Sequence, residues 1–114
     1  MDRVAELEEK IDGSEDPDLI MMSIMETFRD TQWIPEPGKY YTFIYIAKSP
    51  DKIYDEHPLI ACMSLERWGF KGLNFHWGTM RNYTWQEVVG SLHVIENNEI
   101  DYLRSLDYAK YRNK

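Results

Sequence analysis

The sequence predicts an α+β domain in which a small antiparallel β-sheet, or an SH3-like barrel, lies between N-terminal and C-terminal helices. Apolar residues recur at helical spacing within residues 1–28 and again after residue 97. Between these regions, short alternating or apolar stretches predict strands. The chain has 114 residues, of which 43% are hydrophobic and 14% aromatic, so it can form one domain with a buried core.

We divide the chain into an acidic helical arm packed on the domain (residues 1–36), a β-rich core (residues 37–96), and a C-terminal helix and tail (residues 97–114). The formal net charge is -7 and it is unevenly spread. The arm holds eleven acidic and three basic residues, whereas the rest of the chain holds nine acidic and ten basic ones. An acidic chain repels nucleic acid at long range, so this charge favours a basic protein partner.

Cysteine content and hydropathy limit the class of protein further. Cys62 is the single cysteine, which excludes a disulfide within the chain and a cysteine-based zinc site. It lies in an apolar run, which predicts a buried, unreactive thiol, and the lack of disulfides fits a reducing compartment. There is no run of about 18 apolar residues and the N-terminus is charged throughout, so we expect no membrane span and no signal peptide.

Residues 1–11 predict a short amphipathic helix, because Val4, Leu7 and Ile11 fall on one helical face. Gly13 ends this helix. About three turns of helix are marginally stable alone, so the segment is expected to pack on its own domain or on a neighbouring subunit.

A second helix is expected to begin at Asp16 and Pro17, which suit the N-cap and the first helical position. Its apolar surface is wider than a single stripe, which predicts a well-buried helix. That surface consists of Leu19, Ile20, Met22, Ile24, Met25 and Phe28.

Residues 31–38 predict an extended connector, since Pro35 and Pro37 prevent a helix. Trp33 and Ile34 are expected to anchor this connector to the core.

Residues 40–47 form the surest strand, and both of its faces are largely apolar, so both are expected to be covered. Tyr41, Phe43, Tyr45 and Ala47 point to one side. The following segments are predicted to be a turn at residues 49–52, an irregular stretch at residues 53–57 and a second strand at residues 59–65.

Gly69 and Gly72 predict a turn over residues 67–72, because glycine permits a positive φ or a close backbone approach. A third strand is expected at residues 73–77. Thr84 and Glu87 then fit a capping box, which predicts a short helix that ends at Gly90.

The remaining residues predict a short strand at residues 91–95 and a final helix capped by Asn97. Ile100, Leu103 and Leu106 are expected to face inward from that helix. The basic aromatic tail, residues 108–114, is expected to fray.

Asp55, Glu56, His57 and His76 are the only plausible set of acid–base groups or metal ligands. Their spacing matches no metal motif, so hydrogen-bonding roles are expected instead, and His93 is expected to be a core or partner-facing residue. No nucleophile motif and no phosphate-binding loop is present. We therefore expect no catalytic, cofactor or metal site, with a hydrolase centred on Asp55, His57 and His76 as the least favoured alternative.

Aromatic and cationic residues interleave between residues 39 and 85. They suit the anchors of a protein interface, or a small barrel that stacks bases on aromatic rings and binds phosphates with Lys39, Lys71 and Arg81. The alternative is that they are core aromatics with Lys and Arg stems around them. The candidate partner-binding residues are Arg67, Trp68, Phe70, Lys71, Trp77, Arg81, Tyr83 and Trp85.

Four segments, which cover about a third of the chain, form a recognisable pattern. They are Pro37-Gly38-Lys39-x-Tyr41-x-Phe43-x-Tyr45-x-x-Lys48, Tyr54-Asp55-x-x-Pro58-Leu59, Gly69-Phe70-x-Gly72-Leu73-Asn74-x-His76 and Arg81-x-Tyr83-Thr84-Trp85. This pattern resembles small virion- or assembly-associated proteins of tailed bacteriophages, especially those with contractile tails.

The resemblance implies a non-enzymatic structural or assembly protein of the virion, or a protein associated with DNA ends. It implies other virion proteins, or further copies of the chain, as partners, and the virion or the host cytoplasm as location. It transfers no catalytic residue.

Overall fold

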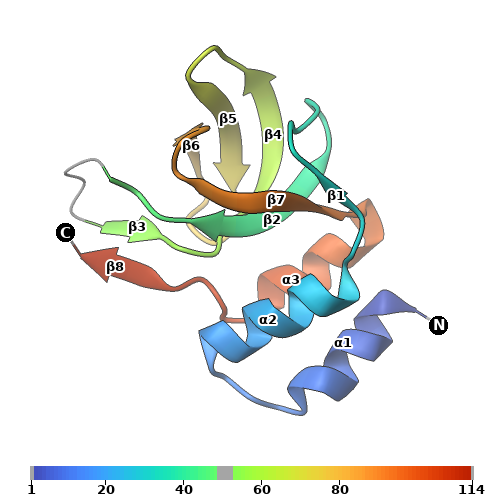
Figure 1. The fold of residues 1–114 in the computed structure, drawn as a ribbon. Coiled ribbons are helices and arrows are strands. Elements are labelled where there is room, and N and C mark those ends of the chain that lie inside the picture. Colours follow the sequence, from blue (N-terminus) through green and yellow to red (C-terminus); the bar gives the residue numbers. More distant parts are fainter. Residues whose placement is uncertain (1, 49–52, 114) are drawn as a thin grey trace.

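The structure is a computed structural model that describes residues 2–48 and 53–113. It is an α+β fold with a six-stranded antiparallel sheet, a two-stranded ribbon and three α-helices (Figure 1). In chain order, the elements are α1 (Arg3–Ile11), α2 (Pro17–Thr27), β1 (Thr31–Gln32), β2 (Tyr40–Tyr45), β3 (Ile53–Asp55), β4 (Leu59–Leu65), β5 (Gly69–Asn74), β6 (Thr79–Thr84), β7 (Val88–Ile95), a 3₁₀ turn (Asn97–Glu99), α3 (Ile100–Ser105) and β8 (Tyr111–Asn113).

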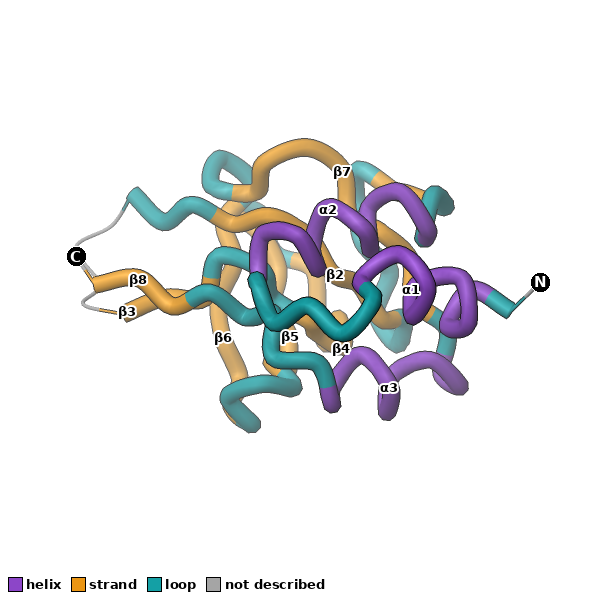
Figure 2. Tube along the Cα trace, turned by 90° about the horizontal axis from the view of Figure 1, so that it is seen from below, coloured by secondary structure: helices purple, strands orange, loops and turns teal. Residues whose placement is uncertain are grey.

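The three helices lie together on one side of the strands (Figures 1 and 2). Both predicted N-terminal helices are confirmed. Asp16 caps α2 by accepting a hydrogen bond of 3.0 Å from the Asp18 N–H, and Pro17 is the first helical residue. The break after α1 is confirmed by left-handed conformations at Asp12 (φ 44°) and Gly13 (φ 76°). α1 packs against α2 of its own chain.

The six-stranded sheet has the order β1-β7-β2-β4-β5-β6, and all neighbouring strands are antiparallel. The sheet is not closed, since β1 and β6 form its two edges, so the predicted antiparallel sheet is present and a barrel is not confirmed. The ribbon of β3 and β8 lies beside it (Figure 1).

Two hydrophobic clusters cover the two faces of β2, as its alternation predicts. Tyr41, Phe43, Tyr45 and Ala47 belong to an aromatic cluster within the curled sheet. The other cluster lies between the sheet and the helices and includes Tyr108. Cys62 is buried in the aromatic cluster, as predicted.

The tail does not fray within the described residues, contrary to the prediction. β8 pairs with β3, which gives both the tail and the segment expected to be irregular a regular set of hydrogen bonds. Tyr108 is fully buried, and its hydroxyl lies 3.0 Å from Thr42 Oγ1. These long-range contacts leave no local signal in the sequence of the tail.

The third strand and the short helix were also predicted wrongly. Strand β5 begins at Gly69, and β6 was missed. Residues 85–87 form a tight turn between β6 and β7 instead of the predicted helix, and the Glu87 carboxylate accepts a hydrogen bond of 2.5 Å from Thr84 Oγ1. The two capping-box residues therefore contact one another in the turn that joins β6 to β7, two strands that are not paired with each other. The final helix is preceded by a 3₁₀ turn, so Asn97 is not its cap.

Trp33 and Ile34 do not anchor the connector, because 74% and 57% of their surfaces are exposed. The two-residue strand β1 fixes the connector instead, by pairing with β7. On α2, Leu19 and Met22 are also exposed, so that helix is buried on fewer sides than predicted.

Candidate functional site

The predicted partner-binding residues do not form a single site. The structure separates them into the aromatic core, one end of the sheet, the opposite end and one exposed strand position. Since Gly69 pairs with Thr84 and Asn74 pairs with Thr79, the β4–β5 and β6–β7 turns lie at one end and the β5–β6 turn lies at the other.

Phe70 and Tyr83 lie in the aromatic core and cannot contact a partner directly. They are 0% and 3% exposed, and their rings stack with centroids 5.4 Å apart. Burial raises the pKa of the Tyr83 hydroxyl, which therefore stays protonated. For these two residues, the alternative that the aromatic side chains belong to the core is correct.

Trp68 and Trp85 lie at the end of the sheet that holds the β4–β5 and β6–β7 turns. Trp85 packs on Phe70 with ring centroids 5.5 Å apart, and its indole N–H donates a 2.9 Å hydrogen bond to the Arg67 carbonyl. Trp33 joins them from the connector after β1. Two grooves share Trp85 as a lining residue. We call the large apolar side chains that line them the tryptophan surface, which consists of Trp33, Ile34, Trp68, Trp85 and Val88.

The two grooves differ in chemistry. The first is about 310 Å³ in volume and is lined by Trp33, Ile34, Trp85, Val88, Gly90 and Leu92, so it is apolar. The second is about 500 Å³ and contains Lys48 and Arg67 beside Trp68 and Trp85. Together they can receive a large apolar side chain with a negative charge next to it.

Glu87 also lines the second groove, but its carboxylate is bonded within the chain. It accepts hydrogen bonds from the hydroxyls of Tyr45 and Thr84 and from the backbone N–H of Lys48. Burial, and then the bond to Glu87, raise the pKa of Tyr45 to about 12, so this tyrosine remains a donor. The groove therefore presents its cations more openly than its carboxylate.

The opposite end of the sheet holds a separate cation–aromatic group. The Arg81 guanidinium lies 3.9 Å from the centre of the Trp77 ring, which also packs on Tyr111 at 5.3 Å. Lys71 is exposed on β5, where it pairs with Asn82 of β6. The Arg81 guanidinium and the Trp77 ring therefore make a cation–π contact with each other within the chain.

Asp55, His57 and His76 do come close together, in a buried polar network beneath the ribbon. Asp55 is 4% exposed and accepts hydrogen bonds from the backbone N–H of His57 (2.8 Å) and the side-chain amide of Asn74 (3.3 Å). Burial raises the pKa of the Asp55 carboxyl. The adjoining cavity is only about 20 Å³, which suits a water molecule rather than a substrate.

The side chains next to Asp55 also make contacts that hold the fold together. His57 Nδ1 lies 2.9 Å from the Tyr108 carbonyl, and Glu56 binds Arg112 of β8. Within residues 2–48 and 53–113, no three His, Cys, Asp or Glu side chains are placed to hold a metal ion. His93 lies in β7 and contacts the Phe28 carbonyl through Nδ1 at 2.7 Å.

Replacing His76 with glutamine should flatten the dependence of stability on pH. His76 Nε2 lies 3.3 Å from the Leu106 carbonyl, which requires a proton on Nε2, and burial lowers the imidazole pKa from its ordinary value of 6.5. Below about pH 6.5 the unfolded chain then binds a proton that the folded chain does not, so the wild type loses stability as pH falls. Urea unfolding at about pH 5.5 and about pH 7.5 measures this, and equal pH slopes for wild type and His76→Gln would contradict it.

Trp33, Ile34 and Val88 belong to the tryptophan surface but were not predicted as site residues. Their large apolar side chains are equally suited to a core, so the residue types alone assign them there. The sequence did hold one signal for the exposure of Trp33 and Ile34. Pro35 and Pro37 follow them and prevent this segment from continuing as a strand inside the sheet.

Comparison of the chain with protein-family models, curated proteins and solved structures gave no match. In the described part of the chain, every helix is too short or too polar to cross a membrane.

Proposed function

We propose that the chain is a non-enzymatic structural or assembly protein of a bacteriophage virion that works by protein-protein contact through the tryptophan surface. The observation that carries this proposal is the convergence of Trp33, Trp68 and Trp85, from three separate connections, onto two grooves that share Trp85. Tryptophan is enriched among residues that dominate interface energies, and clustered exposed apolar residues mark interaction sites. The resemblance to small phage proteins supports the virion as the setting.

The chemistry of the grooves defines the partner. An apolar side chain fits beside Trp33 and Val88, and a carboxylate fits beside Lys48 and Arg67. We therefore expect a protein segment that carries a large apolar residue next to Asp or Glu, supplied by another virion protein or by a second copy of the chain.

Nucleic-acid binding is the second candidate, supported by the exposed Lys71 and by the aromatic rings near Arg67. Two of the cations it would use are engaged within the chain. Lys39 pairs with Glu36 at 2.8 Å, and Arg81 stacks on Trp77.

Light scattering with and without a short DNA duplex distinguishes the two functions. A defined oligomer whose mass does not change when DNA is added supports protein assembly. A monomer that binds the duplex at low salt and releases it at moderate salt overturns the proposal in favour of nucleic acid, because phosphate contacts weaken steeply with salt.

Trp33→Ala and Trp68→Ala should each weaken partner binding by about tenfold or more, since both rings are exposed anchors. Trp77→Ala is the matched control, because Trp77 lies at the opposite end of the sheet. A photoreactive side chain placed at position 33 should cross-link to a virion protein in cells that assemble the particle, and Trp68→Ala should abolish the adduct. Adducts with nucleic acid alone, or equal adducts from positions 33 and 77, would contradict the proposal.

A further inference from the structure

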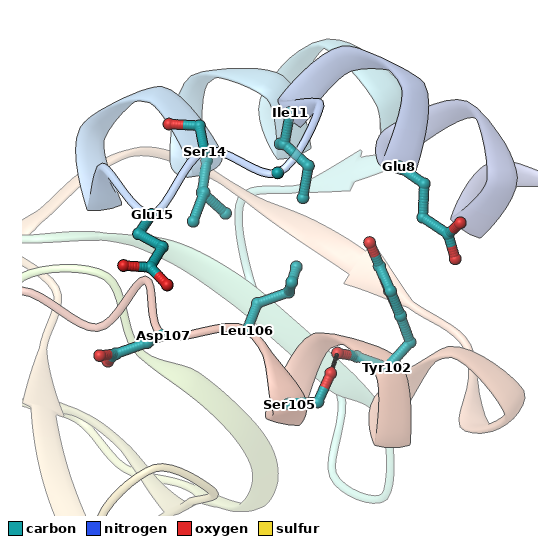
Figure 3. Close-up of a pocket in the computed structure, with 10 residues that line it drawn as sticks. Glu8, Ile11, Ser14, Glu15, Tyr102, Ser105, Leu106 and Asp107 are labelled. Atoms are coloured by element: carbon teal, nitrogen blue, oxygen red, sulfur yellow. Dashed lines mark hydrogen bonds between the residues drawn. The ribbon is translucent and has the colours of Figure 1, made fainter.

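A second cavity lies in the helix layer, away from the tryptophan surface, and its volume is about 510 Å³. It opens between the end of α1 and the turn that follows it on one side, and the end of α3 on the other (Figure 3). The lining residues are Glu8, Ile11, Gly13, Ser14, Glu15, Ile20, Tyr102, Ser105, Leu106 and Asp107.

The floor of this cavity is apolar. Ile11 and Ile20 belong to the core between helices and sheet, and Tyr102 and Leu106 pack against that core while remaining partly exposed. Figure 3 shows Tyr102 and Leu106 rising from the α3 side toward α1. An aliphatic stem or a small apolar side chain could therefore lie here and remove apolar surface from water.

The rim of the cavity is negatively charged. Figure 3 shows Glu15 from the turn and Asp107 from the segment after α3 on one side of Leu106, and Glu8 from α1 beside Tyr102 on the other side. None of the ten lining residues is basic. Burial and the charge of Glu8 raise the pKa of Tyr102, which agrees with the two side chains facing one another.

The backbone adds to this negative potential. α1 ends at Ile11 and α3 ends at Ser105, and both residues line the cavity. The C-terminal end of a helix carries a partial negative charge, which favours a cation nearby.

Three basic side chains from the elements around the cavity make contacts with other residues. Lys10 lies 3.7 Å from Glu6 and 3.8 Å from Glu26, and Lys110 bonds to Asp18 at 2.8 Å. Arg104, one residue before Ser105, lies over the Phe75 ring at 5.9 Å. Within residues 2–48 and 53–113, no ion pair joins Glu8, Glu15 or Asp107 to a basic side chain.

We infer that this cavity docks a basic segment of a partner protein, with a Lys or Arg side chain beside Glu15 and Asp107 and an adjacent aliphatic residue on Ile11 and Leu106. Charge complementarity selects the cation, and the apolar floor selects the aliphatic neighbour. This site is additional to the tryptophan surface, which selects an acidic partner segment. A chain with both surfaces can join two different neighbours in an assembly.

Three peptides test the inference: acetyl-Leu-Arg-Leu-amide, and matched peptides with Gln or Glu in place of Arg. Titrated into ¹⁵N-labelled protein, the Arg peptide should give saturable shifts of the amides near Glu15 and Asp107. The Gln peptide should bind at least about fivefold more weakly, and the Glu peptide should not bind. Equal shifts from all three peptides, or shifts confined to other regions, would overturn the inference.

The double variant Glu15→Gln/Asp107→Asn should weaken binding of the Arg peptide by at least about fivefold. Glu9→Gln/Asp101→Asn is the matched control, since it removes the same two charges at exposed positions outside the cavity. Unchanged melting temperatures confirm that both variants fold. Equal binding to the two variants would overturn the site.

Light scattering decides whether a second copy occupies the cavity instead. An oligomer that dissociates in Glu15→Gln/Asp107→Asn, with no binding of the Arg peptide to the wild type, would overturn the assignment to a basic partner protein. The Trp33 and Trp68 variants leave this cavity unchanged, so failure here is distinguishable from failure of the proposed function.

Discussion

Replacing Gly69 with alanine should destabilise the protein more severely than replacing any other glycine in the sheet, by more than about 4 kcal/mol. A Cβ atom at this position would lie 1.8 Å from the carbonyl oxygen of Tyr83 and 2.8 Å from Thr84 Cα. Both atoms belong to the backbone of β6, so no side-chain rotation can relieve the overlap. The pairing of β5 and β6 at this end must separate, which also disturbs the support of Trp85.

Gly72→Ala is the control, because its Cβ would meet only side chains, at 3.1 Å from Ile60 and 3.2 Å from the Tyr83 ring. Crowding of this kind typically costs about 1–3 kcal/mol. Urea unfolding of both variants measures the difference in free energy of unfolding. Equal losses of unfolding free energy in the two variants would show that β5 and β6 can move apart at little cost, and would refute the steric argument.

Phe43→Ala should lower the free energy of unfolding by about 3–5 kcal/mol. Phe43 is fully buried, and its ring meets those of Phe70, Tyr83 and Tyr45 at centroid distances of 5.8, 5.4 and 6.4 Å, each edge to face. Alanine removes all three ring contacts and leaves a cavity in the aromatic cluster. The strands that carry these rings are β2, β5 and β6.

Denaturant unfolding also tests this prediction, with two comparison variants. Phe43→Leu keeps most of the side-chain volume and should cost less than about 1.5 kcal/mol. Ile46→Ala changes an exposed residue three positions along the chain and should change stability by no more than about 0.5 kcal/mol. A loss for Phe43→Ala close to that for Ile46→Ala would contradict a central role for the aromatic cluster.

The helices and the central strand could be predicted because their signals are local. Asp16 and Pro17 specify the start of α2, and the two apolar faces of residues 40–47 specify a strand covered on both sides. Strand β6 has no such signal. It is an edge strand in which Tyr83 is the single buried side chain, so hydrophobic alternation does not reveal it.

Gly69 illustrates the limit of local reasoning. The sequence indicates that a glycine is needed for a positive φ or for a close backbone approach, and the structure shows the close approach, within a strand instead of a turn. The same limit applies to the candidate site. Trp68 and Trp85 were predicted, but the groove that Trp85 shares with Trp33 depends on the pairing of β1 with β7, which residue types alone do not specify.

The long-range bonds of the helix layer have a consequence for how the chain folds. Arg3 binds Glu99, 96 residues away, and Lys110 binds Asp18, 92 residues away. Contacts between residues so distant in sequence form slowly, because the whole intervening chain must close first. During synthesis, α1 and α2 emerge early and can pack on each other, but Arg3 gains Glu99, and Asp18 gains Lys110, only after those distant residues have left the ribosome. Until then, the apolar surface that the two helices bury against the later part of the chain remains open to chaperones and to other chains.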